Sequence, residues 1–404
     1  MADRSILMEQ LRFHHNFYLY EESVIRDAIQ ALHTQFPSAQ FLYSVKCNPA
    51  GRVLDTVFSQ GLGADAASAA EVDFAWQRGV PKDRIYFSAP GRTEADFRRV
   101  WGRCVLIADS LHELEMISRI AAERGDAAEV GVRLNPDFTF TADQGVPGKF
   151  GIDQEAFFAQ APALAALPGI RLVGIHVHAK SQELDAAALA GYHRKMFRLA
   201  EQVQTLLGTP LQFVNFGSGL GIPFAAGDAP LDLETVGASF RAALADFRKT
   251  APDTRILIET GRYVVGKSGT YVTTVLDKKV SRGKTFLLLC GTLNAFARPA
   301  VSRMVRSYTD SPAPCEPLFT CPWSEALIPL TDRAEQETVT LAGNLCTAAD
   351  IIAQDITLPR MEIGDGLALT NAGCYAAVMT PMQFASLTPP AQLLLTMDGR
   401  VVNA

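Results

Sequence analysis

Short apolar runs rich in β-branched residues alternate with amphipathic stretches from about residue 20 to residue 262. This alternation predicts repeated βα units and a parallel sheet. Eight strands are expected, at 41–46, 62–65, 84–88, 105–109, 129–134, 171–178, 212–216 and 255–259. Eight parallel strands with intervening helices close into a (β/α)8 barrel, whose chemistry lies on the loops at the C-terminal ends of the strands.

The sequence pattern changes after Arg262. Short strand-like runs separated by turn residues follow, at 263–276, 285–289, 337–341, 367–369 and 392–395. Such a series predicts a β domain, a β-sandwich or small barrel. We therefore expect two domains, a barrel at 20–262 and a β domain made of 1–19 and 263–404.

Composition narrows the class of partner. The net charge of −6 comes without a basic block or stripe, so the electrostatic footprint of a nucleic-acid binder is missing and a small-molecule substrate is expected. The seven cysteines are scattered, have no metal-ligand spacing and follow no secretory start, which predicts a reducing cytoplasm and no metal. No apolar run reaches the roughly 20 residues that span a bilayer, so no membrane association is expected.

Lys46 closes the first predicted strand in the run Tyr-Ser-Val-Lys-Cys-Asn-Pro. A lysine at the end of a buried strand is desolvated, which is expected to lower its pKa and make it a competent amine nucleophile. The alternative interpretation is a lysine that extends to solvent from a strand end.

Two histidines close the sixth predicted strand. Strand alternation places His176 and His178 on the same face, and Ser181 follows on the loop. A metal site would need a third ligand that the neighbouring sequence does not supply, and a histidine buried in the core is the other alternative.

A glycine-rich segment, 215–223, follows the seventh predicted strand. Glycines let backbone N–H groups approach an anion, and barrels favour phosphate sites after strands 7 and 8. The eighth strand then ends with Glu259 and Arg262, for which a salt bridge at the strand end is the structural alternative. Together with Lys46, these residues supply what pyridoxal 5′-phosphate (PLP) requires: a phosphate anchor, a partner for the pyridine nitrogen and a Schiff-base amine.

Several motifs occur in the order typical of one enzyme family. They include Tyr-Ser-Val-Lys-Cys-Asn, His-Val-His-Ala-Lys-Ser-Gln, Gly-Ser-Gly-Leu-Gly, Glu-Thr-Gly-Arg, Gly-Asn-Leu-Cys-Thr-Ala-Ala-Asp and Asn-Ala-Gly-Cys-Tyr-Ala. From about Phe17 to Phe384 the chain resembles the fold-type III PLP-dependent decarboxylases, the group of diaminopimelate, ornithine and arginine decarboxylases that is distantly related to alanine racemase.

The resemblance implies a role for each matching residue. Lys46 would hold PLP as a Schiff base, His178 would stack on its ring, and Glu259 would contact the pyridine nitrogen. Asp65 and Arg133 would support the lysine and the ring. Cys346 would enter from the partner subunit of a head-to-tail homodimer and protonate Cα. The phosphate would be held by Ser181, Gly217, Ser218, Gly219, Arg262 and Tyr375.

The substrate-binding positions depart from the family pattern. Diaminopimelate and ornithine enzymes carry a carboxylate after the cysteine for the substrate's distal ammonium, whereas this chain has Thr347, with Asp350 nearby. Loss of such a charge-assisted hydrogen bond costs about 1.5–3 kcal/mol. Arg298 matches a residue that contacts a distal carboxylate, but the expected tyrosine is Ser302 and an expected glycine is Lys180.

We therefore expect decarboxylation of a citryl-, acyl- or carrier-linked amino acid in siderophore or other specialised biosynthesis. A diaminopimelate-type decarboxylase of primary metabolism and an amino-acid racemase are the enzymatic alternatives. A non-catalytic regulatory homologue is the alternative of another class, against which the retained Lys46, Glu259 and Cys346 argue.

Overall fold

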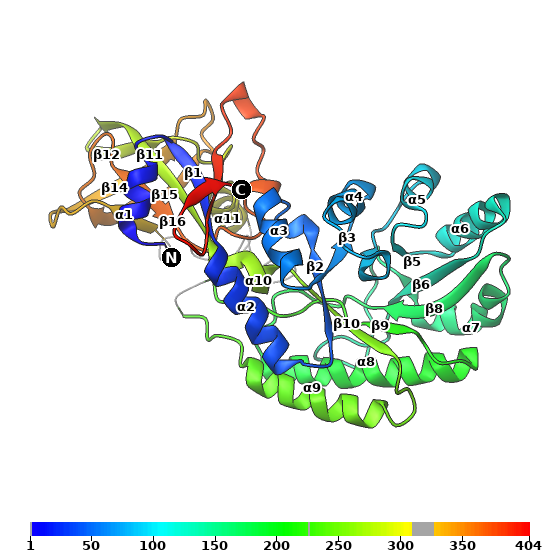
Figure 1. Ribbon diagram of the computed structural model, residues 1–404. Coiled ribbons are helices and arrows are strands. Elements are labelled where there is room, and N and C mark those ends of the chain that lie inside the picture. The colour runs from blue at the N-terminus through cyan, green and yellow to red at the C-terminus, as the bar shows by residue number, and fades with distance from the viewer. Residues whose placement is uncertain (1, 225–226, 309–326) are drawn as a thin grey trace.

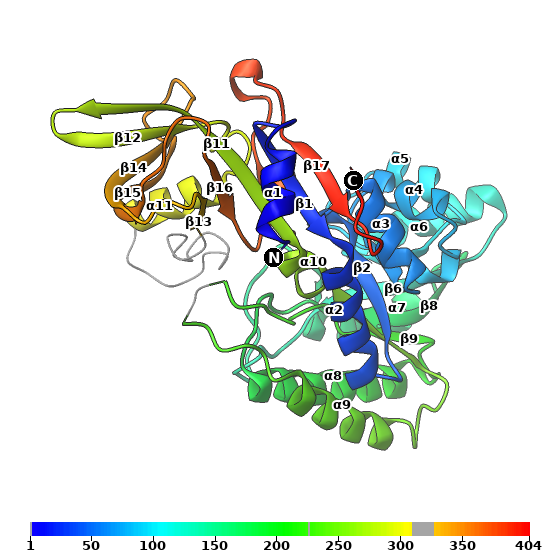
Figure 2. The same ribbon diagram turned by 60° about the vertical axis from the view of Figure 1, so that its left-hand side comes forward.

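The computed structural model describes residues 2–224, 227–308 and 327–404. Two sheets organise these residues, a closed parallel barrel and a separate curled sheet beside it (Figures 1 and 2). In the proline-rich stretch 307–324, for which the sequence suggests no role, residues 309–324 lie outside the described residues. No helix in the described ranges combines the length and the apolar character needed to cross a membrane.

The predicted (β/α)8 barrel is confirmed, and each strand lies within two residues of its expected bounds. Parallel pairing runs in the order β5-β4-β3-β2-β10-β9-β8-β6 and closes through β5 and β6, with the short β7 (Ile152–Asp153) added beside β6. The strands are β2 (Gln40–Ser44), β3 (Gly63–Ala66), β4 (Ile85–Phe87), β5 (Val105–Ala108), β6 (Ala128–Asn135), β8 (Ile170–His176), β9 (Phe213–Asn215) and β10 (Arg255–Thr260).

Helices cover the outside of the barrel (Figure 1). Their apolar faces pack inward; on α2, for example, Ile25, Ile29 and Leu32 recur at helical spacing and are buried. The end of α6 is set by Gly125, whose left-handed conformation stops the helix as the sequence suggests. The helices are α2 (Glu22–Gln35), α3 (Gly51–Ser59), α4 (Ala69–Gln77), α5 (Glu94–Val100), α6 (Leu111–Arg124), α7 (Gln154–Ala165), α8 (Ala186–Leu207) and α9 (Leu233–Phe247).

The barrel interior is packed with apolar side chains below the strand ends. Phe213 occupies the space that Gly131 and Gly174 leave free, because a Cβ on either glycine would lie within 2.7 Å of its ring. The other members of this cluster are Leu42, Tyr86, Ile107, Val173 and Leu257. The barrel below the strand ends is therefore a packed core and not a channel.

The second sheet brings the start of the chain together with its last third. Its order is β15-β14-β12-β11-β1-β17-β18, with β16 paired to both β11 and β13. The strands are β1 (Asn16–Glu21), β11 (Gly269–Ser281), β12 (Lys284–Leu289), β13 (Leu327–Leu330), β14 (Gln336–Gly343), β15 (Ile351–Pro359), β16 (Gly366–Leu369), β17 (Ala391–Leu395) and β18 (Val401–Asn403). Two helices, α1 (Arg4–Gln10) and α11 (Arg298–Tyr308), accompany it.

Two expectations for this part of the chain need correction. The run 263–276 is not one strand, because α10 (Arg262–Val265) and a 3-10 turn precede β11. Arg298 begins helix α11 where the sequence suggested only strands and turns. We retain 20–262 and 1–19 with 263–404 as proposed domain limits, although β1 continues to Glu21.

Candidate active site

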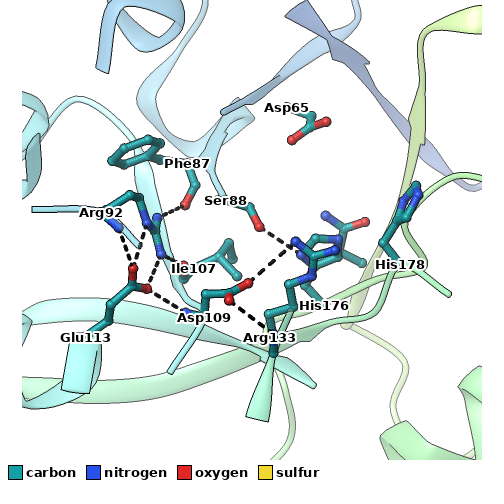
Figure 3. A network of polar contacts seen from close by, with 12 residues as sticks. Asp65, Phe87, Ser88, Arg92, Ile107, Asp109, Glu113, Arg133, His176 and His178 are labelled. Atoms are coloured by element: carbon teal, nitrogen blue, oxygen red, sulfur yellow. Dashed lines mark hydrogen bonds and ion pairs between the residues drawn. The ribbon is translucent and has the colours of Figure 1, made fainter. Parts of the chain in front are cut away.

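Each of the eight barrel strands carries a buried polar side chain within two residues of its C-terminal end. Figure 3 shows several of these side chains projecting from neighbouring strands toward a common space. In strand order they are Ser44, Asp65, Ser88, Asp109, Arg133, His176, Asn215 and Glu259. We call these residues the strand-end ring. Such a collection of buried charges at the barrel mouth is typical of a catalytic centre.

Lys46 lies in the 3-10 turn Val45–Cys47 rather than in the strand itself. Its Nζ lies 2.7 Å from Oδ2 of Asp65, and the same oxygen accepts a hydrogen bond from Ser44 at 2.8 Å. Desolvation lowers the pKa of Lys46, but the carboxylates of Asp65 and Glu259 raise it by more, so the net shift is upward. The expected lowering of this pKa is therefore wrong, because the two strands beside β2, β3 and β10, place the carboxylates of Asp65 and Glu259 near the amine.

Glu259 is buried at the centre of the ring. Its Oε1 accepts a hydrogen bond from Asn215 at 2.9 Å and lies 3.1 Å from Nε2 of His176, while Oε2 lies 3.6 Å from Nδ1 of His178. Burial alone would raise the pKa of this carboxyl, but the two histidines and Lys46 hold it well below its usual range. Glu259 is therefore a carboxylate at neutral pH, the form that can stabilise a proton on a pyridine nitrogen.

The two histidines both face Glu259, although β8 ends at His176 and not at His178. The backbone N–H of Ser218 donates to Nδ1 of His178 at 3.2 Å. Nε2 of the same ring lies 3.2 Å from Oγ of Ser181, within hydrogen-bonding distance. His178 is thus held by the predicted anion loop on one side and by Ser181 on the other.

The glycine loop after β9 adopts backbone conformations that other residues avoid. Gly217 has φ +62°, and a Cβ there would lie 2.3 Å from the carbonyl oxygen of Val177. Gly219 has φ +146°. The amides of Gly217 and Ser218 already donate to Asn215 Oδ1 and His178 Nδ1. The predicted phosphate contacts of this loop therefore depend on Gly219 and on the Ser218 hydroxyl.

Two buried guanidinium groups lie beside the site. Arg262, at the start of α10, packs over the rings of Tyr375 and Phe224 at 5.3 and 5.7 Å. Arg298 packs over the same Phe224 ring at 5.5 Å and donates from Nη2 to the carbonyl of Asn371 at 2.6 Å. This concentration of positive charge suits an anionic group such as a phosphate.

Tyr375 is tied to the turn that carries Lys46. Its backbone N–H donates to the carbonyl of Cys47 at 2.9 Å, and its φ of +48° places it in the left-handed region. Burial raises the pKa of its hydroxyl, so it remains a hydrogen-bond donor at neutral pH. These contacts place the predicted lysine and one predicted phosphate ligand on adjoining segments.

Arg133 connects the strand-end ring with the long loop that follows β6. Its guanidinium packs 4.3 Å over Phe150. Its Nη1 is 3.5 Å from Oδ1 of Asp109 (Figure 3). The other oxygen of Asp109 accepts from the backbone N–H of Gly151 at 3.1 Å. The ion pair therefore attaches the end of this loop to the strand-end ring.

Sequence reasoning missed four members of the strand-end ring and the buried pair behind it. Arg92 and Glu113 approach to 2.6 Å, and Arg92 also donates to the carbonyls of Phe87 and Ile107, which fixes the ends of β4 and β5 (Figure 3). The missed ring members are Ser44, Ser88, Asp109 and Asn215. One signal was available, since a polar residue stands at the end of every predicted barrel strand or one position before it.

The substrate-binding candidates lie away from the barrel strands. Cys346 is exposed and Thr347 is half-buried on the loop after β14, and the Thr347 hydroxyl accepts from the N–H of Ala349 at 3.3 Å. Ser302 is buried on α11, one turn after Arg298. Arg298 is fully buried, and its contacts favour a role in the wall of the site over the predicted contact with a distal acid.

Asp350 makes several contacts within its own chain. Its buried carboxylate accepts hydrogen bonds from the Thr292 hydroxyl, from Leu293 N at 3.0 Å and from Leu345 N at 2.9 Å. These three donors occupy both of its oxygens. Asp350 therefore holds two loops of the second sheet together, and its contact with a substrate stays a prediction.

Residues 22–266 match the family model described as the pyridoxal-binding domain of pyridoxal-dependent decarboxylases. Among curated proteins, the L-glutamyl-[BtrI acyl-carrier protein] decarboxylase of Niallia circulans is 30% identical over 95% of this chain and 89% of its own. The diaminopimelate decarboxylase of Archaeoglobus fulgidus is 29% identical over 94% and 88%. The 2-[(L-alanin-3-ylcarbamoyl)methyl]-2-hydroxybutanedioate decarboxylase of Staphylococcus aureus is 25% identical over 94% of both chains.

Solved structures show the same architecture. Diaminopimelate decarboxylase from M. jannaschii in complex with L-lysine superposes with a TM-score of 0.85, covers 98% of this chain and 91% of its own, and is 22% identical. At this level of identity the likeness establishes the arrangement of barrel and second sheet alone.

Proposed function

The chain belongs to the pyridoxal-dependent decarboxylases, and from this premise we propose that it decarboxylates an amino acid whose distal end carries an acyl group in place of a free amine. As a member of this family, the chain is a PLP-dependent carboxy-lyase. The finer part of the proposal depends on Asp350, the one acid in the loop 344–350, whose buried carboxylate accepts three hydrogen bonds within the protein.

The residues of the barrel mouth fit the cofactor. Lys46 is 44% exposed at the mouth, while Asp65 beneath it is buried, so the amine can reach an aldehyde. Glu259 would contact the ring nitrogen, and His178, held in one orientation, would lie against the ring. Arg262, Tyr375, Ser181 and the loop Gly217–Gly219 would hold the phosphate. When bound, PLP supplies an electron sink for the electron pair left on Cα as carbon dioxide departs.

The protein would contribute to the reaction by holding or transferring protons at three residues, Glu259, Lys46 and Cys346. Glu259 would keep a proton on the ring nitrogen of bound PLP, because a buried carboxylate favours the cationic form of its partner. Lys46 must lose a proton before it acts as an amine, and Asp65, at 2.7 Å, is a nearby acceptor. The exposed Cys346 thiol would return a proton to Cα, a step that typically contributes about 10²–10⁴-fold in rate.

This role for Cys346 requires a second subunit. The residue lies on a loop of the second sheet and is exposed in the single chain. We infer a head-to-tail homodimer in which the 344–350 loop of one protomer enters the barrel mouth of the other. The exposure of Cys346 beside a half-buried Thr347 is consistent with a loop that is covered by a partner.

The chemistry of this loop favours a substrate without a distal ammonium. Thr347 presents a neutral hydroxyl, and the Asp350 carboxylate is held by three donors. A buried ammonium left without a charged partner loses a contact worth about 1.5–3 kcal/mol. An amide or thioester at the distal end carries no such charge and would tolerate the neutral loop.

The names of two relatives state substrates of this class. One acts on a glutamyl group attached to an acyl-carrier protein, and the other on an amino acid joined through an amide to a hydroxy-tricarboxylate. Diaminopimelate decarboxylases are about as similar as these two relatives, so a free diamino acid is the competing substrate.

A substrate panel tests the proposal. Holoenzyme is incubated with ornithine, diaminopimelate, glutamyl-carrier protein and citryl-diaminopropionate, and carbon dioxide and product masses are recorded. We expect product from one or both acylated members only. Turnover of diaminopimelate or ornithine at about 10 s⁻¹, an ordinary rate for a good substrate, would contradict the proposed class.

A further inference from the structure

Helix α8 carries a fully buried tyrosine to the back of the candidate site. The hydroxyl of Tyr192 lies 2.8 Å from the carbonyl oxygen of Phe216 and 3.3 Å from that of Val177. These carbonyls belong to the residues directly before Gly217 and His178. One hydroxyl group therefore bridges the ends of β8 and β9 at the point where each strand becomes a functional loop.

The two strand ends are in direct contact at this point. A Cβ on Gly217 would lie 2.3 Å from the Val177 oxygen and 2.8 Å from the Cα of His178. In addition, the Ser218 N–H donates to the His178 ring. A small change in the separation of the strand ends would thus alter both the orientation of His178 and the direction of the glycine loop.

An aromatic side chain from the loop after β6 supports the same tyrosine. Phe140 stacks on Tyr192 with ring centroids 4.3 Å apart and planes 6° from parallel. The Phe140 ring and Leu189 of α8 also border Gly219, where an added Cβ would lie 3.0 Å from each of them. The Tyr192 ring is therefore fixed by packing, and its hydroxyl has one well-defined direction.

The hydroxyl is a permanent donor. Burial raises the pKa of Tyr192, and the nearby Glu259 carboxylate adds to that effect. Backbone carbonyls only accept, so the single proton is directed at Phe216, with Val177 as the longer contact.

We propose that Tyr192 is a positioning residue that sets the spacing between His178 and the Gly217–Gly219 loop and thereby selects cofactors that carry a phosphate. The inference rests on the proposed assignment of this loop to the cofactor phosphate. It names a residue outside the barrel strands and outside the family motifs of the sequence. Its effect acts through backbone carbonyls and requires no contact with the cofactor.

The test compares two ligands that differ only in the phosphate. The dissociation constants of PLP and of pyridoxal are measured for the wild-type enzyme and for Tyr192→Phe, which keeps the stacked ring. We expect PLP to bind about tenfold more weakly to the variant, the equivalent of one hydrogen bond, while the pyridoxal constant changes less than about threefold.

Tyr271→Phe is the matched control. Tyr271 is also fully buried, and its hydroxyl likewise contacts two backbone carbonyls, those of Gly291 and Cys290, but in the second sheet. We expect this variant to lose thermal stability to a similar extent without discriminating between the two ligands. If Tyr192→Phe binds both ligands like wild type, weakens both equally, or matches Tyr271→Phe, the positioning role is wrong.

Arg262→Gln separates this inference from the proposed site. Weaker PLP binding in Arg262→Gln with normal selectivity in Tyr192→Phe would leave the phosphate site in place and refute the role of Tyr192. Unchanged PLP binding in Arg262→Gln would show that the phosphate site itself is misassigned, and the inference would fall with it.

Discussion

The ammonium of Lys46 and the carboxylate of Asp65 form an ion pair of 2.7 Å at the mouth of the barrel. Asp65 is buried and is held in place by Ser44, whereas Lys46 reaches toward solvent. The pair raises the pKa of Lys46 despite desolvation, so without bound cofactor this amine stays protonated at neutral pH. Asp65 therefore favours the protonated form of the free lysine.

Replacing Asp65 by Asn should lower the pKa of Lys46. The variant removes an anion and leaves the desolvation, so the midpoint for reaction of Lys46 with an amine reagent should move to lower pH. Peptide mapping of the labelled lysine across a pH series measures this midpoint. Ser44→Ala keeps the carboxylate and should shift it less. An unchanged or higher midpoint in Asp65→Asn would show that the ion pair does not set the pKa.

Glu259→Gln should reduce kcat about 10²-fold while PLP still binds, because an amide cannot stabilise a cationic ring nitrogen and the phosphate ligands remain. Steady-state kinetics and the absorbance of bound cofactor give the two readouts. Glu113→Gln is the control, since Glu113 is an equally buried carboxylate that pairs with Arg92 behind the strand ends. It should lower stability with little change in kcat. Equal losses of kcat in both variants would contradict the assigned role of Glu259.

His193 should make the fold less stable in acid. It is buried among the rings of Phe36, Phe216 and Phe240, and desolvation lowers its pKa to about 3. Below the unfolded pKa of about 6.5 the unfolded chain binds a proton that the folded chain does not, so stability falls by about 1.4 kcal/mol per pH unit until about pH 3.

Urea unfolding of wild type and His193→Phe between pH 4 and 7 measures this contribution. The variant should lose that part of the pH dependence, whereas replacement of the exposed His112 by Gln should leave the dependence as in wild type. A His193→Phe protein with the full wild-type slope would contradict the burial of a neutral imidazole.

Thr347→Glu should favour substrates with a distal ammonium. A carboxylate at this position restores the charged partner, so the ratio of kcat/KM for a free diamino acid to that for an acylated one should rise about tenfold or more. Thr347→Gln adds similar bulk without charge and serves as the control. If both variants change the ratio equally, the 344–350 loop does not discriminate between substrates by the charge of their distal group.

Two inactive variants should complement each other if the active site is shared. In a mixture of Lys46→Ala and Cys346→Ala chains, each heterodimer has one site with both native residues, so random exchange should restore about a quarter of wild-type activity. Activity is measured after exchange of subunits. If the mixture is no more active than the separate variants, Cys346 and Lys46 of one site come from the same chain or Cys346 has no catalytic role.

The sequence predicts the barrel well because its helices and strands follow local periodicity. All eight strands are found within two residues, and Gly125 ends its helix as expected. The second sheet is less predictable, because its strands pair over long separations, for example β1 with β11 and β17. Local pattern also gives no warning that 263–276 begins with a helix or that Arg298 starts one.

The sequence predicts which residue types form the candidate site, but not the direction of their pKa shifts or their hydrogen-bond partners. Lys46, His178 and Glu259 are identified from motif positions, yet the direction of the pKa shift of Lys46 depends on how closely Asp65 and Glu259 approach it. Asp350 shows the same limit, because only its three donors reveal that its carboxylate is already occupied. Tyr192 lies in the middle of an amphipathic helix, where its sequence looks like ordinary core.

The most direct test of the proposed function is a kinetic comparison of one amino acid in free and acylated form. The kcat/KM for release of carbon dioxide is measured for L-2,3-diaminopropionate and for its citryl amide with the same holoenzyme. We expect kcat/KM to be at least about tenfold higher for the amide. The 344–350 loop offers no charged partner to the distal ammonium of the free diamino acid, whereas the amide needs none. A preference for the free diamino acid would contradict the account and make the enzyme a diamino-acid decarboxylase with an altered pocket.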